Sequence, residues 1–359
     1  MKKIDWYIIR KFLSSFFFAI GIIVIIVIVF DFSEKVDDFY ENKAPFKSIV
    51  FQYYLNFIPY FINIFSSLIV FISVIFFTSK MAGFSEIVAI LSSGVSFKRL
   101  LRPYVLAAAF IGVFSFMLAN FIIPPANKER IAFQNNYFKS GEYKNKNVHI
   151  HMQTKPGEYV YVERYNVENN TGHKFSLERV SQQHLMYKLH ADVIQWDSIE
   201  NKWKLTNYYI RFIKGEQEYV FRGSSMDTTL TLSPKDFYQD KRNIETMNFF
   251  QLNRFIEQEK IKGSDEVPFF QVEKHKRIAY PFSAIILTLI AVSLSSRKTR
   301  GGIGLHLGIG IALSFIYIMF MQITTTFATN GNLHPFMAVW IPNLLFAVVA
   351  AWLVYKAPK

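Results

Sequence analysis

The chain has no cysteine among its 359 residues. It therefore forms no disulfide and has neither a thiolate metal site nor a cysteine nucleophile, so any exported part must fold on its apolar core alone. The G-x-S-x-G, H-E-x-x-H and Walker A patterns are also absent, and no acidic pair lies inside an apolar run. We therefore expect no catalytic residue, no bound metal and no cofactor of its own, and no ion transport through intramembrane carboxylates.

Apolar residues, by contrast, are abundant: 51% of the chain is hydrophobic and 17% is aromatic, including 38 Phe. They gather in runs of roughly twenty residues, the length of helix that crosses about 30 Å of hydrocarbon. The runs cover residues 12–30, 57–77, 104–123, 278–294, 303–327 and 336–355. No small-residue cleavage pattern follows the first run, which is predicted to be retained. The sequence therefore predicts six transmembrane helices.

The net charge is +13, and the Lys and Arg residues cluster beside these apolar runs. Six crossings put four basic segments on one side, and the positive-inside rule makes that side cytoplasmic. The acidic loop after the first run and the loop at 330–334, which has no Lys or Arg, fit the opposite side. Both termini are thus predicted in the cytoplasm, and nucleic-acid binding is disfavoured. The basic segments contain Lys2, Lys3, Arg10 and Lys11; Lys80, Lys98, Arg99 and Arg102; residues 297–300; and Lys356 and Lys359.

Residues 124–273 have a different composition, polar and rich in Tyr, Lys and Asn. Short alternating runs separated by turn residues predict strands at 147–154, 158–165, 188–196, 202–213 and 218–223. An amphipathic helix is predicted at 247–263, ending at a glycine. The chain is therefore predicted to be an α-helical membrane protein with transmembrane halves at 1–123 and 274–359 and an inserted all-β domain, a sandwich or jelly roll, at 124–273.

A short helix is predicted at residues 85–93, between the second and third spans, and is too short to cross a bilayer. Ile87, Ile90 and Leu91 have the spacing of one helix face. Glu86 stands at the front, and Ser85 is a candidate N-cap. Such a helix either lies on the bilayer surface or presents its apolar face to a partner protein.

Two other features have ordinary explanations. His149 and His151 alternate on a strand and can ligate a metal, but the sequence supplies no convincing further ligands. Small residues at Gly304, Gly308 and Ala312 fit a close helix-packing face better than a nucleotide loop, since the GK[ST] ending is absent.

Several motifs occur together along the chain. They are D-x-Y at residues 5–7, E-I-x-A-I-x-x-x-G at 86–94, R-P at 102–103, the large β insertion, K-R-I-A-x-P-F at 276–282, and a glycine-rich fifth span. In this order and spacing the chain resembles the lipopolysaccharide-export permease family (LptF/LptG type), the transmembrane subunit of an ABC-type lipid exporter. The resemblance covers essentially the whole chain.

The resemblance implies a permease that extracts lipopolysaccharide from the outer leaflet of the bacterial inner membrane. It implies that the β domain is a periplasmic jelly roll, which passes the lipid to a bridge of similar jelly-roll proteins toward the outer membrane. The implied partners are a second related permease chain and a homodimeric ABC ATPase, which binds and hydrolyses the ATP. No nucleic acid is involved.

The resemblance also implies site residues. The helix at about 85–93 becomes the coupling helix that docks on the ATPase, with Glu86 at the position of the acidic contact residue and Ile87, Ile90 and Leu91 as its apolar face. Lys35, Lys43 and Lys47, just outside the membrane, become candidates for binding lipid phosphates. Lys35 lies near a basic position of the family, although Asp37 and Asp38 can neutralise it. The alternative function is a membrane-anchored scaffold or sensor with an exported β domain and no transport role.

Overall fold

The computed structural model describes residues 2–138, 147–182, 184–237, 241–297 and 302–357. The chain divides into two compact units. The helical unit contains Met1–Phe138, Glu245–Leu252 and Pro268–Lys359, and the β unit contains Lys139–Ile244 and Asn253–Val267.

The helical unit confirms the prediction of six spans. Within the described residues, six helices are long and apolar enough to cross a membrane. Two of them, covering Phe46–Gly83 and Phe97–Tyr137, each contain a π-helical stretch. The elements are α1 (Lys3–Glu41), α2 (Phe46–Ser48), η1 (Ile49–Tyr54), α3 (Leu55–Gly83), α4 (Glu86–Ser92), α5 (Phe97–Met117), η2 (Leu118–Ile122), α6 (Ile123–Tyr137), α8 (Val267–Ser295), α9 (Gly302–Asn330) and α10 (Pro335–Lys356).

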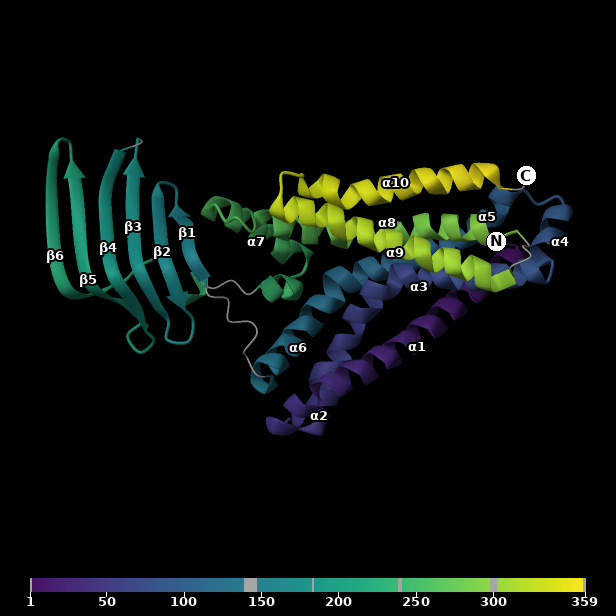
Figure 1. Cartoon of the computed structure of the whole chain (residues 1–359), viewed down its shortest axis with the longest axis horizontal. Coiled ribbons are helices and arrows are strands. Elements are labelled where there is room, and N and C mark those ends of the chain that lie inside the picture. The colour runs from purple at the N-terminus through teal and green to yellow at the C-terminus, as the bar shows by residue number, and fades with distance from the viewer. Residues whose placement is uncertain (1, 139–146, 183, 238–240, 298–301, 358–359) are drawn as a thin grey trace. The chain divides into compact units, whose positions relative to one another are not determined.

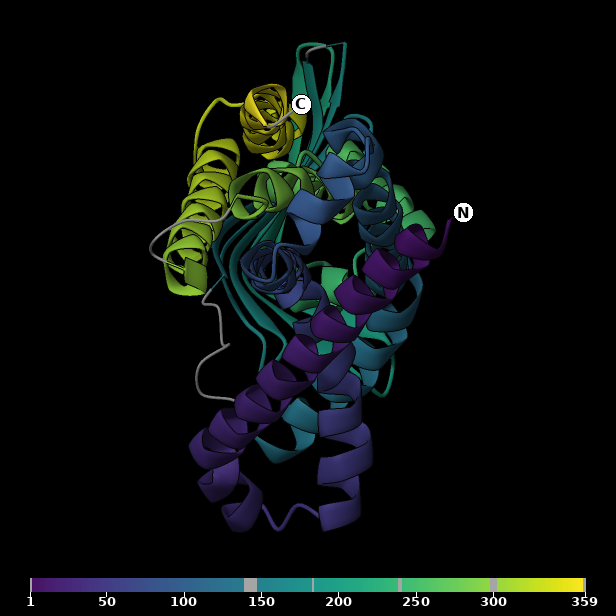
Figure 2. The same cartoon turned by 90° about the vertical axis from the view of Figure 1, so that its right-hand side faces the viewer.

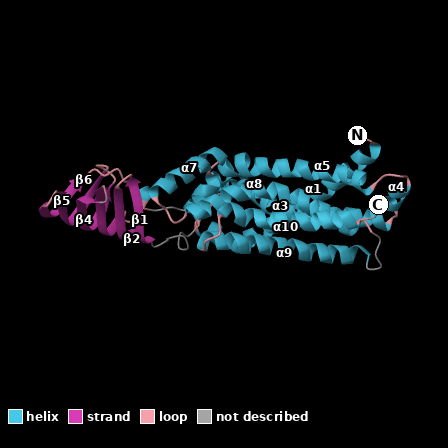
Figure 3. Ribbon diagram, turned by 90° about the horizontal axis from the view of Figure 1, so that it is seen from above, coloured by secondary structure: helices cyan, strands magenta, loops and turns pink. Residues whose placement is uncertain are grey.

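Local sequence explains where several of these helices begin and bend. Ser96 caps α5 by accepting a hydrogen bond from the Arg99 backbone N–H at 3.3 Å. The π-helical stretch η2 stands just before Pro124 and Pro125, which open α6 because proline tolerates the first helical turn. The start of α1, the end of α10 and α4 lie at one end of the helical unit (Figures 1 and 3), and α1 runs from there toward α2 (Figures 1 and 2).

Apolar packing holds the helical unit together from the inside. Its main core joins residues of α1, α3, α4, α5, α8, α9 and α10, with Phe12, Phe71 and Tyr104 among the largest fully buried side chains. The outer faces are also apolar: Phe18 is 72% exposed and Phe30 is 73% exposed. A helix that is apolar all round is expected where lipid replaces water as the surrounding solvent.

The β unit is an antiparallel sheet, as the alternating sequence pattern predicted. It contains β1 (Asn147–Lys155), β2 (Glu158–Asn166), β3 (Thr171–Ser181), β4 (His184–Asp197), β5 (Lys202–Lys214) and β6 (Gln217–Thr228). The strand order is β1-β2-β3-β4-β5-β6, so each strand pairs with its sequence neighbours. This is a meander within the described strands, and the crossover connections of a full jelly roll are not among them. The sequence pattern did not identify β3.

One face of the sheet carries the core of the β unit. Val162, Phe175 and Trp203 are fully buried there, together with Phe237 from the segment after β6. The Trp203 indole N–H donates to the Leu232 carbonyl at 2.8 Å, which fixes that segment over the sheet. The predicted helix is α7 (Phe249–Lys262), and Gly263 follows it with φ of 69°, a left-handed conformation that glycine adopts without strain.

Candidate functional site

The short helix α4 forms between α3 and α5, but its N-terminus differs from the prediction. Ser85 has φ of 61° and makes no side-chain capping bond, so the prediction that it caps α4 was wrong. Its left-handed backbone turns the chain sharply after Phe84. A capping serine needs an extended backbone to reach the first free N–H groups, and this turn denies it that geometry.

The predicted apolar face of α4 turns inward. Ile87 is 1% exposed and belongs to the main core of the helical unit, and Ile90 and Leu91 pack partly buried against that core. These residues therefore anchor α4 to its own bundle. The assignment of Ile87 as a partner contact gives way to this structural role, because a side chain buried in its own chain has no surface to offer.

Two apolar residues that the sequence analysis did not select are exposed on α4 and at the turn that precedes it. Phe84 is 69% exposed and Val88 is 54% exposed. Val88 lies on α4 itself, whereas Phe84 lies just before the left-handed turn at Ser85 that separates α3 from α4. The exposure of these two side chains could not be read from the sequence, where the Ile87–Ile90–Leu91 spacing is the stronger pattern.

The N-terminus of α1 holds α4 and its flanking segment through the D-x-Y motif. Tyr7 donates a hydrogen bond from its hydroxyl to Glu86 Oε2 at 2.9 Å. Two residues earlier, Asp5 accepts two parallel hydrogen bonds from the Arg99 guanidinium, at 2.8 and 2.7 Å. The motif therefore fastens α1 both to α4 and to the start of α5, and this explains its spacing in the sequence.

The three predicted lipid-binding lysines have unlike surroundings. Lys35 forms an ion pair with Asp31 and donates to the Tyr53 hydroxyl at 2.7 Å. Its partner is thus Asp31, four residues earlier, and not the neighbouring acids considered from the sequence. Lys43 and Lys47 are exposed on the turn and short helix that follow α1.

An aromatic cluster surrounds Lys35. Its ammonium lies 5.4 Å from the Tyr53 ring centroid and 5.9 Å from that of Phe57. Asp31, which is 9% exposed, also accepts hydrogen bonds from the hydroxyls of Tyr53 and Tyr54, each at 3.2 Å. The charge of Lys35 is therefore partly compensated, whereas those of Lys43 and Lys47 face outward.

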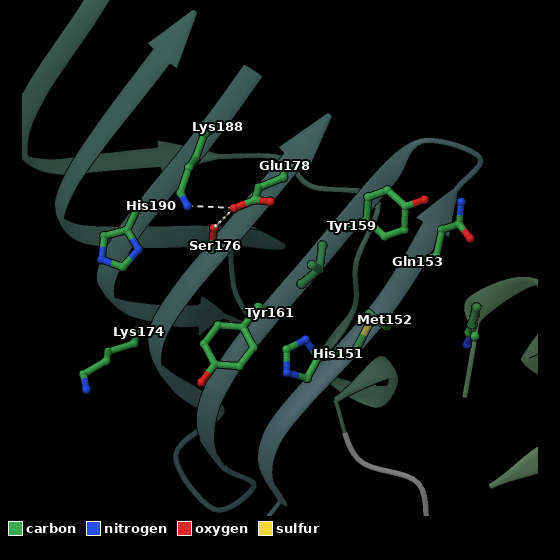
Figure 4. Close-up of a pocket in the computed structure, with 13 residues that line it drawn as sticks. His151, Met152, Gln153, Tyr159, Tyr161, Lys174, Ser176, Glu178, Lys188 and His190 are labelled. Carbon is green, nitrogen blue, oxygen red and sulfur yellow. Dashed lines mark hydrogen bonds and ion pairs between the residues drawn. The ribbon is translucent and has the colours of Figure 1, made fainter. Parts of the chain in front are cut away.

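The polar face of the sheet in the β unit carries a depression of about 640 Å³ (Figure 4). Figure 4 shows His151 beside Tyr161, and these ring centroids are 4.6 Å apart. Lys188 and Ser176 both reach Glu178, at 2.7 and 3.4 Å. These groups are mutually satisfied, so the depression offers aromatic and hydrogen-bonding surface with little free charge.

The two histidines of β1, His149 and His151, contact the side chain of Tyr161. His149 Nδ1 lies 2.9 Å from the Tyr161 hydroxyl. Burial lowers the pKa of His190. No group of three or more potential metal ligands occurs in the part of the chain that the structure describes.

These features define a class: a multi-pass membrane protein with a large inserted β unit and a short helix at the end that holds both termini. The family model described as lipopolysaccharide export system permease LptF/LptG matches residues 6–356, and the chain belongs to this family. A search among curated proteins finds no match. Membership makes the chain a permease of lipopolysaccharide export, a transport subunit of the inner membrane.

Proposed function

We propose that the chain is the permease subunit of an ABC-type exporter that extracts lipopolysaccharide from the outer leaflet of the inner membrane. A separate homodimeric ATPase drives it, and a second related permease pairs with it. The β unit is periplasmic and passes the lipid to a bridge of β-jelly-roll proteins. Both termini and α4 lie in the cytoplasm.

The observation that carries this proposal is the construction of α4. Ile87 anchors the helix in the core, the Tyr7 hydroxyl holds Glu86, and Phe84 and Val88 remain exposed. A helix that is fixed to its own bundle, with exposed apolar side chains on it and just before it and a carboxylate at its start, suits docking into a groove of a partner protein. Because α4 packs directly on the spans, a push on it reaches the membrane helices.

The lipid side of the proposal rests on charge and apolar surface. Lys43 and Lys47 are exposed at the end of the helical unit opposite α4, where phosphates of an outer-leaflet lipid would lie. The exposed apolar faces of α1 and α9, which include Phe18 and Phe315, offer surface to acyl chains or to a second permease.

The alternative, a membrane-anchored scaffold or sensor, needs no ATPase contact at α4. On that reading Glu86 and Val88 lie against the bilayer surface. Replacing Glu86 by Lys then strengthens attraction to anionic lipids and disturbs nothing else.

A pull-down experiment decides between these functions. The variants Glu86→Lys and Val88→Asp should each lose the ATPase, because one reverses a charge at the contact and the other puts an unpaired carboxylate into it. Each should cost about 2–5 kcal/mol of association if the contact is desolvated. The measurement is the amount of ATPase that co-purifies with the tagged chain from its native membrane.

The matched control is Ile199→Asp, which makes the same kind of change at a side chain that is 93% exposed in the β unit. It should retain the ATPase fully. Full retention and normal lipopolysaccharide export in both α4 variants would refute the docking role.

A further inference from the structure

A second cavity, of about 360 Å³, lies inside the helical unit. Its walls come from α3, η2, α6, α8 and α9 together with Glu245, which belongs to the same unit. None of the three predicted lipid-binding lysines lines it. Its polar lining comprises Tyr60, Asn63, Asn127, Glu245, Glu273, Lys276, Arg277, Tyr280 and Gln322.

Both carboxylates of the cavity already have cationic partners. Glu245 pairs with Arg130 at 3.2 Å and accepts from the Asn127 amide at 3.4 Å. Glu273 pairs with Arg277, whose Nε lies 3.3 Å from Glu273 Oε1. These pairs leave no acid of the lining to neutralise a further cation.

Lys276 is that further cation. Within the described parts of the chain it has neither an ion pair nor a hydrogen bond, although it is partly buried and lines the cavity. The cavity therefore carries about one uncompensated positive charge. An anion is the ligand that such a site favours.

Neutral groups around Lys276 are also unsatisfied. Asn127 is fully buried, yet its Oδ1 accepts no hydrogen bond from the described residues. The hydroxyls of Tyr60 and Tyr280 likewise have no hydrogen-bond partner in the described ranges. A buried polar atom without a partner is costly, so the Asn127 oxygen, together with the two tyrosine hydroxyls in the same lining, indicates a site made for a polar ligand.

The backbone of this wall is unusual as well. Ala119 lies in η2, a π-helical stretch that interrupts the long helix from α5 to α6. Such interruptions cluster at functional sites because they shift the side chains that follow. Asn127, about one turn into the α6 helix that follows η2, lines the cavity together with residues of α8.

We infer that this cavity binds a phosphorylated lipid headgroup, with Lys276 as counter-ion to the phosphate. The tyrosine hydroxyls donate to the phosphate oxygens, and the free Asn127 oxygen accepts from a hydroxyl or amine of the same headgroup. The volume is at the small end of ligand pockets, which are roughly 300–1,000 Å³, so it holds one headgroup and no acyl chains. The inference rests on the lipid substrate of the proposed function and is independent of ATPase docking at α4.

Native mass spectrometry of the full chain in detergent micelles tests this site. The probes are lipid A with its phosphates, the same lipid A after enzymatic dephosphorylation, and inorganic phosphate. Lys276→Gln should bind phosphorylated lipid A about tenfold more weakly, because one charge-assisted hydrogen bond is lost. Lys276→Arg keeps the charge and should restore binding.

Lys274→Gln is the matched control, the same change two residues earlier on α8 at a side chain that does not line the cavity. It should bind like the unaltered chain. Competition by inorganic phosphate, reduced in Lys276→Gln, would support a phosphate site that takes free phosphate as well. Equal binding of phosphorylated lipid A by all variants, or equal binding of the dephosphorylated lipid by the unaltered chain, would overturn the inference.

Discussion

At the scale of single residues, Tyr7 near the N-terminus contacts α4, which is far away along the sequence. Its hydroxyl is the described hydrogen-bond partner of Glu86, the acidic residue of α4. An exposed glutamate on a helix of seven residues samples many rotamers, and a donor at 2.9 Å restricts it to one. Tyr7 is therefore a positioning residue for a contact made by its neighbour.

Tyr7→Phe tests this positioning role. The change removes one hydrogen bond, worth about 0.5–1.5 kcal/mol, and should weaken ATPase binding by about two- to tenfold. Measured affinity of the purified chain for its ATPase reports the effect, and Glu86→Ala combined with Tyr7→Phe should cost no more than Glu86→Ala alone, because alanine leaves no acceptor for the Tyr7 hydroxyl.

Tyr40→Phe serves as the control, since Tyr40 lies on the same helix, is 85% exposed and is remote in sequence from the motif. If Tyr7→Phe and Tyr40→Phe bind the ATPase equally well, Tyr7 does not position Glu86.

Residue-level predictions failed where tertiary contacts decide the outcome. The spacing of Ile87, Ile90 and Leu91 correctly marks one helix face, but periodicity does not tell whether a bundle or a partner covers that face. Ser85 has a good capping propensity, yet the turn after α3 sets its backbone. The sequence did identify the D-x-Y motif. Its partners Glu86 and Arg99 are 79 and 94 residues away along the chain, so only the folded structure reveals the pairing.

At the scale of elements, the C-terminal half of α1 is held by side chains of η1 and α6. Phe39 of α1, Tyr53 of η1 and Phe133 of α6 form one aromatic cluster, in which the Tyr53 and Phe133 ring centroids are 5.4 Å apart. Asp31 and Lys35 form their ion pair against this cluster. The cluster keeps α1 helical as far as Glu41, beyond its apolar run.

Two charge reversals separate structure from lipid binding in this region. Lys35→Glu puts a carboxylate beside Asp31 and should lower stability by about 1–3 kcal/mol. The double variant Lys43→Glu and Lys47→Glu should keep its stability, because both side chains are exposed, and should cross-link less lipopolysaccharide. Thermal unfolding in detergent and photo-cross-linking measure the two effects.

The charge-preserving double variant Lys43→Arg and Lys47→Arg is the control and should cross-link normally. Unchanged cross-linking in the Lys43→Glu and Lys47→Glu chain would show that these lysines are only solvated charges.

Elements with a strong repeating signal were predictable from sequence. Continuous apolar runs identified all six spans, and strict alternation identified most strands. The sequence pattern did not predict β3 because its first residues, Thr171 to Lys174, lack alternating apolar side chains, and its buried stretch at 175–177 includes Ser176. The π-helical stretches have no sequence signature of this kind, so the walls of the 360 Å³ cavity were not foreseen.

At the scale of the whole molecule, the distribution of charge predicts which side of the membrane each segment faces. Lys2, Lys3, Arg10 and Lys11 flank the start of α1, and Lys356 ends α10, at the end of the helical unit that also holds α4. Positive charge in short segments beside spans stays on the cytoplasmic side. The β unit is inserted between the third and fourth spans, an odd number of crossings from the N-terminus, so the proposed topology predicts it on the other side.

The absence of cysteine makes this topology directly testable. Ser224→Cys in β6 and Ser93→Cys after α4 each add a single thiol at an exposed position. A membrane-impermeant maleimide applied to cells with a permeabilised outer membrane should label Ser224→Cys and leave Ser93→Cys unlabelled until the inner membrane is opened. The unaltered chain has no thiol and gives the blank. Equal labelling of the two variants while the inner membrane is intact would contradict this topology. It would require an even number of crossings between α4 and the β unit, whereas the topology has one span between them, Phe97–Tyr137.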